Sequence, residues 1–132
     1  MSCTLVCDIA YTHTILVPPG ESVHHTYIVI SDQLPTSCQI ITYLNHPQSK
    51  AQIDMIGIIH NDKRVSLDGQ ILIGKDGIQT SGHLQEEVVI IGDHSYSSTK
   101  PILDVHNNQV SASHSAKIHT INPIQLFYLM SR

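Results

Sequence analysis

The sequence predicts an all-β fold, and three observations point to that class. Ile, Val, Ser, Thr and His are far more frequent than the helix formers Ala, Glu and Lys, which is the composition of strands. Short apolar runs recur at intervals of roughly 8 to 12 residues, with turn residues between them. Hydrophobic residues make up 41% of the chain and charged residues only 14%, so the chain is not disordered and has enough apolar surface for a core.

The apolar runs give the positions of the expected strands. In chain order they are residues 4–10, 13–17, 27–30, 39–44, 53–59, 70–73, 88–91, 102–105 and 110–118. Turn signals, where Pro, Gly, Asn and Asp gather, fall at residues 18–20, 45–47, 61–62, 68–69, 75–77, 92–93 and 107–108. This spacing is typical of a sandwich, a barrel or a β-solenoid, and periodicity alone does not choose among them.

Two features favour the solenoid. The runs that end at Ile73 and Ile91 are continuous and do not alternate with polar residues, as expected for parallel strands inside a covered core. Hairpin turns are also scarce, since Asp68-Gly69 and Asp76-Gly77 are the only candidates. With 132 residues, the chain is expected to form one domain over residues 1–132.

One helix is predicted, at the C-terminal end of the sequence. Asn122 is a good N-cap, Pro123 suits the first helical position, and Gln125 completes a variant of the capping box. The segment 123–132 is too short to be stable alone and is rich in apolar residues. We therefore expect it to pack against another surface.

Charge and hydropathy exclude several classes of function. Seven Lys and Arg against eleven Asp and Glu give a net charge of −4, so no basic surface for nucleic acid can be assembled. No stretch approaches the roughly 20 apolar residues of a membrane helix, and the N-terminus lacks the features of a signal peptide. These observations predict a cytoplasmic protein that contacts neither nucleic acid nor membrane.

The three cysteines are expected to be reduced thiols. Their odd number and the lack of a secretion signal argue against a disulfide framework. Cys3 and Cys7 would lie on one face of a strand about 13 Å apart, at ~3.3 Å per residue, which is too far for one disulfide or one metal ion. Buried or half-buried thiols are the expected outcome.

Two patterns that suggest catalysis do not support it. Residues 69–75 match the first seven positions of a phosphate-binding loop, but Asp76 stands where Ser or Thr should bind Mg²⁺. Glu86 and Glu87 are adjacent and would diverge, no nucleophile accompanies them, and they fit a solvated corner. No catalytic residue is predicted, and the chain is not expected to be an enzyme.

Among the ten histidines, His114 is the candidate site residue. No His-x-His or His-Glu-x-x-His pattern is present, so the usual histidine metal motifs are missing. In a regular strand His114 would lie on the apolar face between Ala112 and Ala116, which leave room around its imidazole. From the residues alone, a core histidine whose ring nitrogens bond backbone carbonyls is the favoured interpretation.

Three blocks near the C-terminal end carry a resemblance to a known family. They are Lys100-Pro-Ile-Leu-Asp-Val105, the stretch from Val110 that contains Ser113-His114-Ser-Ala116, and Leu126-Phe-Tyr-Leu-Met-Ser-Arg132. Their order and spacing resemble the core of the SufB/SufD family, where the blocks read tP-x-L-x-[IV], D-V-x-x-S-H-G-A-T and l-F-Y-L-x-S-R-G. The resemblance covers residues 78–132, extends back to about residue 50, and before that concerns architecture alone.

The resemblance implies a fold and a site. The implied fold is a single-domain right-handed parallel β-helix with a short C-terminal helix. His114 falls on the family's histidine, which in SufD-type proteins lies at the interface with SufB and is implicated in cluster assembly. We therefore expect His114 to bind metal or cofactor, because an imidazole can ligate iron or stabilise sulfide, and we expect Ser113, His114 and Ser115 to lie at the interface.

Residue by residue, the chain is closer to SufD than to SufB. SufB-type chains carry a cysteine in a G-D-x-C segment and a glutamate directly after the histidine. Here residues 92–95 read Gly-Asp-His-Ser, and Ser115 follows His114, so both SufB-type cluster ligands are missing. The chain also departs from SufD, since Gln109 replaces Asp, Ser115 replaces Gly and Lys117 replaces Thr.

The function implied by the resemblance is a non-catalytic, SufD-like scaffold component of iron–sulfur cluster assembly. It would form a dimer through the β-helix with a SufB-type protein or a second copy, and any iron–sulfur cluster would be shared with that partner. The family's N-terminal and C-terminal helical regions are not found in the sequence. Since the C-terminal region docks the SufC-type ATPase, binding to that ATPase is expected to be weak or lost.

Two other classes of function stay open. One is a small histidine-dependent metal-binding module, in which stacked coils would align His83, His94, His106 and His114. Their intervals of 11, 12 and 8 residues are uneven, which counts against a regular ladder. The other is a structural β-solenoid that associates with itself and holds no cofactor.

Overall fold

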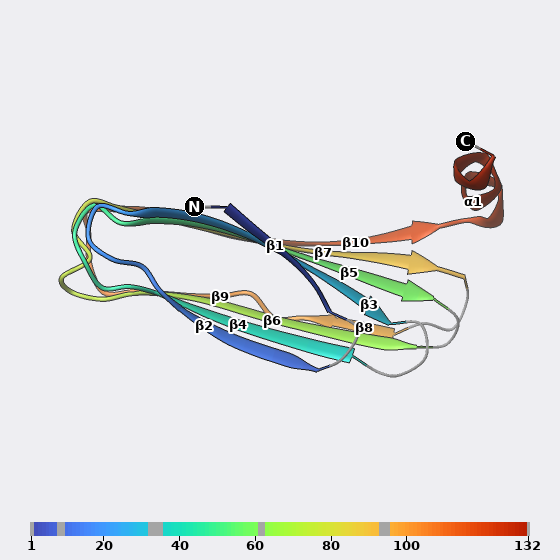
Figure 1. Cartoon of the computed structure of the whole chain (residues 1–132), viewed down its shortest axis with the longest axis horizontal. Coiled ribbons are helices and arrows are strands. Elements are labelled where there is room, and N and C mark those ends of the chain that lie inside the picture. Colours follow the sequence, from blue (N-terminus) through green and yellow to red (C-terminus); the bar gives the residue numbers. More distant parts are fainter. Residues whose placement is uncertain (1, 8–9, 32–35, 61–62, 93–95, 132) are drawn as a thin grey trace.

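A computed structural model describes residues 2–7, 10–31, 36–60, 63–92 and 96–131. The described chain forms two five-stranded sheets that face each other, followed by one helix (Figure 1). Sheet A contains β1 (Ser2–Cys7), β3 (Ser22–Ser31), β5 (Lys50–His60), β7 (Thr80–Ile91) and β10 (Val110–Ile121). Sheet B contains β2 (Tyr11–Leu16), β4 (Thr36–Leu44), β6 (Arg64–Ile73), β8 (Tyr96–Thr99) and β9 (Ile102–Val105).

The chain passes back and forth between the two sheets, and this alternation makes a solenoid. Each strand of sheet A pairs in parallel with the strand of sheet A that follows one coil later, so that Ile53 lies between His25 and Leu84. Sheet B repeats the arrangement, with β8 and β9 both beside β6. The expected all-β fold, in its parallel β-solenoid form, is confirmed, with about three turns.

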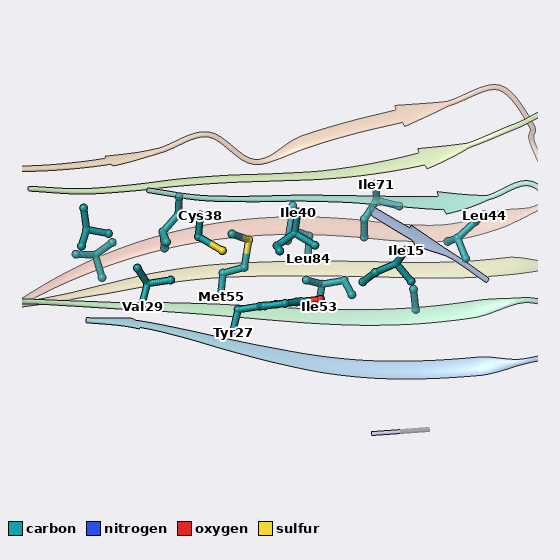
Figure 2. Packing of buried hydrophobic residues seen from close by; sticks show 14 of the residues in the cluster. Ile15, Tyr27, Val29, Cys38, Ile40, Leu44, Ile53, Met55, Ile71 and Leu84 are labelled. Carbon is teal, nitrogen blue, oxygen red and sulfur yellow. The ribbon is translucent and has the colours of Figure 1, made fainter. Parts of the chain in front are cut away.

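The space between the sheets is filled by the inward side chains of each strand. In β5 and β6 every second residue is buried, which is the period of two that a strand imposes. Tyr27 and Met55 from sheet A meet Cys38 and Ile40 from sheet B, and all four are at most 2% exposed (Figure 2). A fully buried Ile or Met side chain of this core contributes about 1.5 to 3 kcal/mol through the apolar area that folding removes from water.

Short turns at one end of the solenoid stack on one another like the strands do. The amide of Gly20 donates to Pro47, that of Gln48 donates to Ile78, and that of Gln79 donates to Gln109. Gln48 and Gln79 both have positive φ, at 59° and 58°, so each coil turns through the same left-handed residue. The stacked turns fix the register of one coil on the next.

The turn predicted at residues 68–69 is wrong, because Asp68 and Gly69 lie in the middle of β6. Asp76-Gly77 does lie in a connection, between β6 and β7, but every pairing among the described strands is parallel, so it makes no hairpin. β8, with the sequence Tyr-Ser-Ser-Thr, is a strand that the apolar pattern did not predict.

The predicted C-terminal helix is confirmed as α1 (Pro123–Met130). The capping box is complete, since Gln125 N–H donates to Asn122 Oδ1 at 2.8 Å and Asn122 N–H donates to Gln125 Oε1 at 3.1 Å. No residue of α1 is buried, so within the described chain it does not pack as expected. No helix in the described part of the chain is both long and apolar enough to cross a membrane.

Candidate functional site

The candidate site lies where the solenoid ends. β10 is the last strand of sheet A and pairs with β7 alone among the described strands (Figure 1). At its start, Val110 and Ala112 still pack against the core. Since β8 and β9 share one position beside β6, the described part of sheet B is one strand position shorter than sheet A. The inward face of β10 is exposed from His114 onward, and Ile118 is 54% exposed. This open inner face is a surface that the solenoid itself leaves uncovered.

His114 lies on that open inner face. It is the register partner of Leu84, which points into the core, so the face predicted from alternation is the one found. The imidazole is exposed, and it makes no hydrogen bond or ion pair with any described residue. The alternative of an enclosed core histidine is therefore not the arrangement found. Both ring nitrogens are available to a ligand, and the neighbouring Ala112 and Ala116 leave the ring accessible.

The two predicted interface serines lie on the opposite face of β10. Ser113 is the register partner of His83, and its hydroxyl lies 2.7 Å from Nδ1 of that histidine. Nε2 of His83 lies 3.1 Å from the hydroxyl of Ser81, so both ring nitrogens of His83 have partners. Ser115 pairs in register with Gln85 and is exposed. Ser113 and Ser115 therefore do not line the face that carries His114.

Glu86 is a buried carboxyl directly below the open face. It is 0% exposed and is the register partner of Ala116. Its Oε1 accepts a hydrogen bond of 2.7 Å from the backbone amide of Gly69 across the core, while Oε2 is buried without a partner. A methyl group at Gly69 would lie 2.8 Å from that Oε1 and 2.7 Å from Leu84, so glycine makes the room for the carboxyl.

Burial raises the pKa of Glu86 from 4.5 to about 7, and the charge of Asp68 adds to that rise. The backbone amides of Gly69 and Lys100 oppose the rise in pKa. The expectation of a solvated corner is therefore wrong for Glu86. Glu87 does point the other way, as expected, and its carboxylate lies 2.8 Å from Nε2 of His119. The alternation between Leu84 and Val88, both buried, is the signal that could have placed Glu86 inside.

Apolar side chains continue from the open face onto α1. Ile124, Phe127 and Met130 are 80%, 75% and 78% exposed. A hollow of about 550 Å³ lies between the end of β10 and α1, lined by His119, Thr120, Ile121, Ile124, Gln125, Tyr128 and Leu129. An exposed surface of this kind, rimmed by polar residues, is typical of a contact with another protein.

The other predicted ligands are not brought together. His83 lies on the outer face of β7, His106 follows β9 and pairs with Asp104 at 3.1 Å, and His94 is outside the described residues. The described residues contain no group of three or more His, Cys, Asp or Glu side chains that could hold a metal ion. This arrangement gives no support to a histidine ladder.

The thiols agree only in part with the expectation. Cys38 is buried and is not in a disulfide, but Cys3 is exposed, so the expectation of a buried or half-buried thiol is wrong for Cys3. β1 is a strand from Ser2 to Cys7, as expected, and the side chain of Cys7 lies outside what the structure describes.

Comparison with known proteins gives the family. Residues 9–132 match the family model described as SUF system FeS cluster assembly, SufBD core domain. An iron–sulfur cluster assembly SufBD family protein of Staphylococcus aureus strain USA300 is 31% identical over 86 residues, which cover 65% of this chain and 18% of that protein. The iron–sulfur cluster assembly protein SufD of Escherichia coli K12 is 28% identical over 97 residues, which cover 72% of this chain and 23% of that protein.

The chain thus spans about a fifth of the length of these curated relatives. The family match covers both sheets from β2 onward as well as the C-terminal blocks, so it includes the whole of the candidate site. On these grounds the chain belongs to the SufBD family of iron–sulfur cluster assembly proteins.

Proposed function

We propose that this chain is a SufD-like scaffold component of iron–sulfur cluster assembly in the cytoplasm, which pairs with a SufB-type partner and catalyses no reaction itself. The observation that carries the proposal is the open end of the solenoid at β10. That end presents an unpaired strand edge, an uncovered inner face and the apolar side chains of α1. The relatedness to SufD supports the choice of pathway.

Pairing at this end supplies what the described chain lacks. A partner strand beside β10 would form hydrogen bonds with the backbone N–H and C=O groups that β10 presents at the edge of sheet A, as edge strands commonly do with another chain. A partner side chain over the inner face would cover Ile118, which is 54% exposed in the described chain. A dimer formed in this way continues sheet A from one protein into the next, so the parallel stacking that joins the coils also has a counterpart between the partners.

His114 is the residue of this chain that we assign to the cluster. Its free imidazole can ligate iron when neutral, or stabilise a thiolate or sulfide when protonated. Ser95 and Ser115 stand where SufB-type chains have cysteine and glutamate, so those ligands come from the partner. The cluster is therefore cargo held between two proteins, with one imidazole from this side.

The 132-residue chain, tested by itself, is expected to bind a SufC-type ATPase weakly. α1 is the one helix among the described residues, and all its side chains are at least partly exposed. In the family the ATPase docks on a helical region, of which α1 would be the first element. We therefore expect the SufB-type contact at β10 to form without the ATPase.

Anaerobic co-purification of the 132-residue chain with SufB-type and SufC-type proteins tests the proposal. We expect a stable complex with the SufB-type protein, whose reconstituted iron and sulfide content falls in His114→Ala. His106→Ala is the matched control, because His106 is also exposed but lies beyond β9, and its complex should keep full iron content. A metal-free homodimer indifferent to the SufB-type protein would contradict the proposal and favour the self-associating solenoid.

A further inference from the structure

Three rings meet inside the solenoid at the end opposite β10. The hydroxyl of Tyr27 lies 2.9 Å from Nδ1 of His13 and 3.1 Å from Nδ1 of His25. The two imidazoles are nearly parallel, with 24° between their planes and 6.4 Å between their centroids. Tyr27 is 2% exposed, whereas the rest of the core is mainly aliphatic. His13 and His25 are half-buried, so the buried Tyr27 hydroxyl depends on them for its hydrogen bonds.

The cluster joins β2, the end strand of sheet B, to β3, the second strand of sheet A. His13 lies on β2, which pairs only with β4 among the described strands, and His25 and Tyr27 lie on β3. The contact between His13 and Tyr27 therefore crosses from one sheet to the other and links β2, at the edge of sheet B, to sheet A. Besides this contact and its ladder with β4, β2 is held by Ile15, which is 6% exposed, and by Tyr11, which packs against the core, whereas its alternate residues such as Leu16 are exposed.

The hydrogen bonds of the cluster suit neutral imidazoles. One Nδ1 can accept from the Tyr27 hydroxyl while the other donates to it, and the hydroxyl can serve both. When both imidazoles are protonated, both Nδ1 atoms are donors and two positive charges face each other at half-buried positions. Burial and the charge of His13 lower the pKa of His25, with other positive charges, including His24, contributing.

Few neighbouring groups can offset a second positive charge. From β1, Cys3 is the register neighbour of His25, and from β2, Tyr11 lies 6.2 Å from the Tyr27 ring. Glu21 is the one carboxylate among the residues that line the adjoining pocket with both imidazoles. His24, on the outer face of β3, is already paired with Asp54 at 2.7 Å.

We propose that His13, Tyr27 and His25 form an acid-sensitive clasp that holds β2 on the solenoid at neutral pH and releases it when both imidazoles are protonated. His25 binds its proton less readily in the folded chain than in the unfolded chain, so release follows as the pH falls below the ordinary histidine pKa of 6.5. The remaining coils, which lack this cluster, keep their strands.

The thiols of the chain report on the clasp. Cys38 lies on β4 beside Tyr11 of β2, and it is 1% exposed, so loss of β2 would uncover it. Cys3 is exposed throughout and provides an internal reference for the pH dependence of thiol reactivity. The chain would carry Cys7→Ser and be treated with a disulfide reagent that reacts at acidic pH. The ratio of the Cys38 rate to the Cys3 rate is the measured quantity.

We expect this ratio to rise at least tenfold between pH 7.5 and pH 5.0, while the circular dichroism of the strands is largely kept. His13→Gln and His25→Gln should each flatten the rise, because one positive charge is removed. His83→Gln, on the outer face of β7, should leave it unchanged. A flat ratio in the parent chain, an undiminished rise in both clasp variants, or loss of the whole strand signal would overturn the proposal.

Discussion

Replacing Glu86 by glutamine should make the chain more resistant to alkaline pH. The folded chain raises the pKa of this carboxyl from 4.5 to about 7, so the folded state holds a proton that the unfolded state releases. The stability that this carboxyl contributes is therefore fully present below pH 4.5 and is lost as the pH rises from 4.5 to about 7. This rise in pKa corresponds to about 3 kcal/mol, at about 1.4 kcal/mol per pKa unit.

Glutamine keeps the acceptor for the amide of Gly69 and removes the titration. Urea unfolding at a series of pH values gives the free energy of unfolding of both chains. From pH 5 to pH 8 we expect the parent to lose roughly 2 to 3 kcal/mol relative to Glu86→Gln, whatever the constant difference between them. Glu87→Gln, on the outer face, should follow the parent. If Glu86→Gln and the parent show the same pH dependence, the carboxyl does not titrate in the core as argued.

Three further substitutions test other parts of the structure. Gly69→Ala should lower the free energy of unfolding by about 1 to 3 kcal/mol, because its methyl would lie 2.7 Å from Leu84, and urea unfolding measures this. Asn122→Ala should remove about 1 kcal/mol of cap energy from α1, visible as lower helix content by nuclear magnetic resonance while the strands persist. Ile118→Asp should weaken binding to the SufB-type partner at least tenfold in titration calorimetry with an unchanged melting temperature. Leu16→Asp, at a residue that is also exposed but lies at the other end of the solenoid, should not weaken that binding.

Elements whose side chains show their own periodicity could be predicted from the sequence. The expected strand at residues 102–105 is found with the same bounds, and the cap of α1 is found as the residues indicate. β8 was not predicted because Tyr-Ser-Ser-Thr contains no apolar run. Its backbone is extended beside β6, with which it pairs in parallel. Propensity is a weak guide where a neighbouring strand supplies the hydrogen bonds.

The site shows the same division between local and distant causes. Alternation gives the face on which His114 lies, but its exposure depends on whether a strand of sheet B lies opposite, which no local pattern encodes. Glu86 lies inside because Gly69, 17 residues earlier, leaves space and offers an amide across the core. An aspartate followed by a glycine predicts a turn from local sequence. That Gly69 makes room for the carboxyl of Glu86 becomes evident only when the two sheets are placed face to face.

The stacking of parallel coils makes the length of this protein adjustable. Ile53 and Leu84 are register partners 31 residues apart, so excising residues 53–83 would put Leu84 where Ile53 stands, beside His25. In a nearest-neighbour array of this kind, each coil adds its own stability and its contact with the next. The shortened chain should melt at a lower temperature yet still present β10 and α1 unchanged. The surface formed by β10 and α1 therefore does not depend on how many coils precede it.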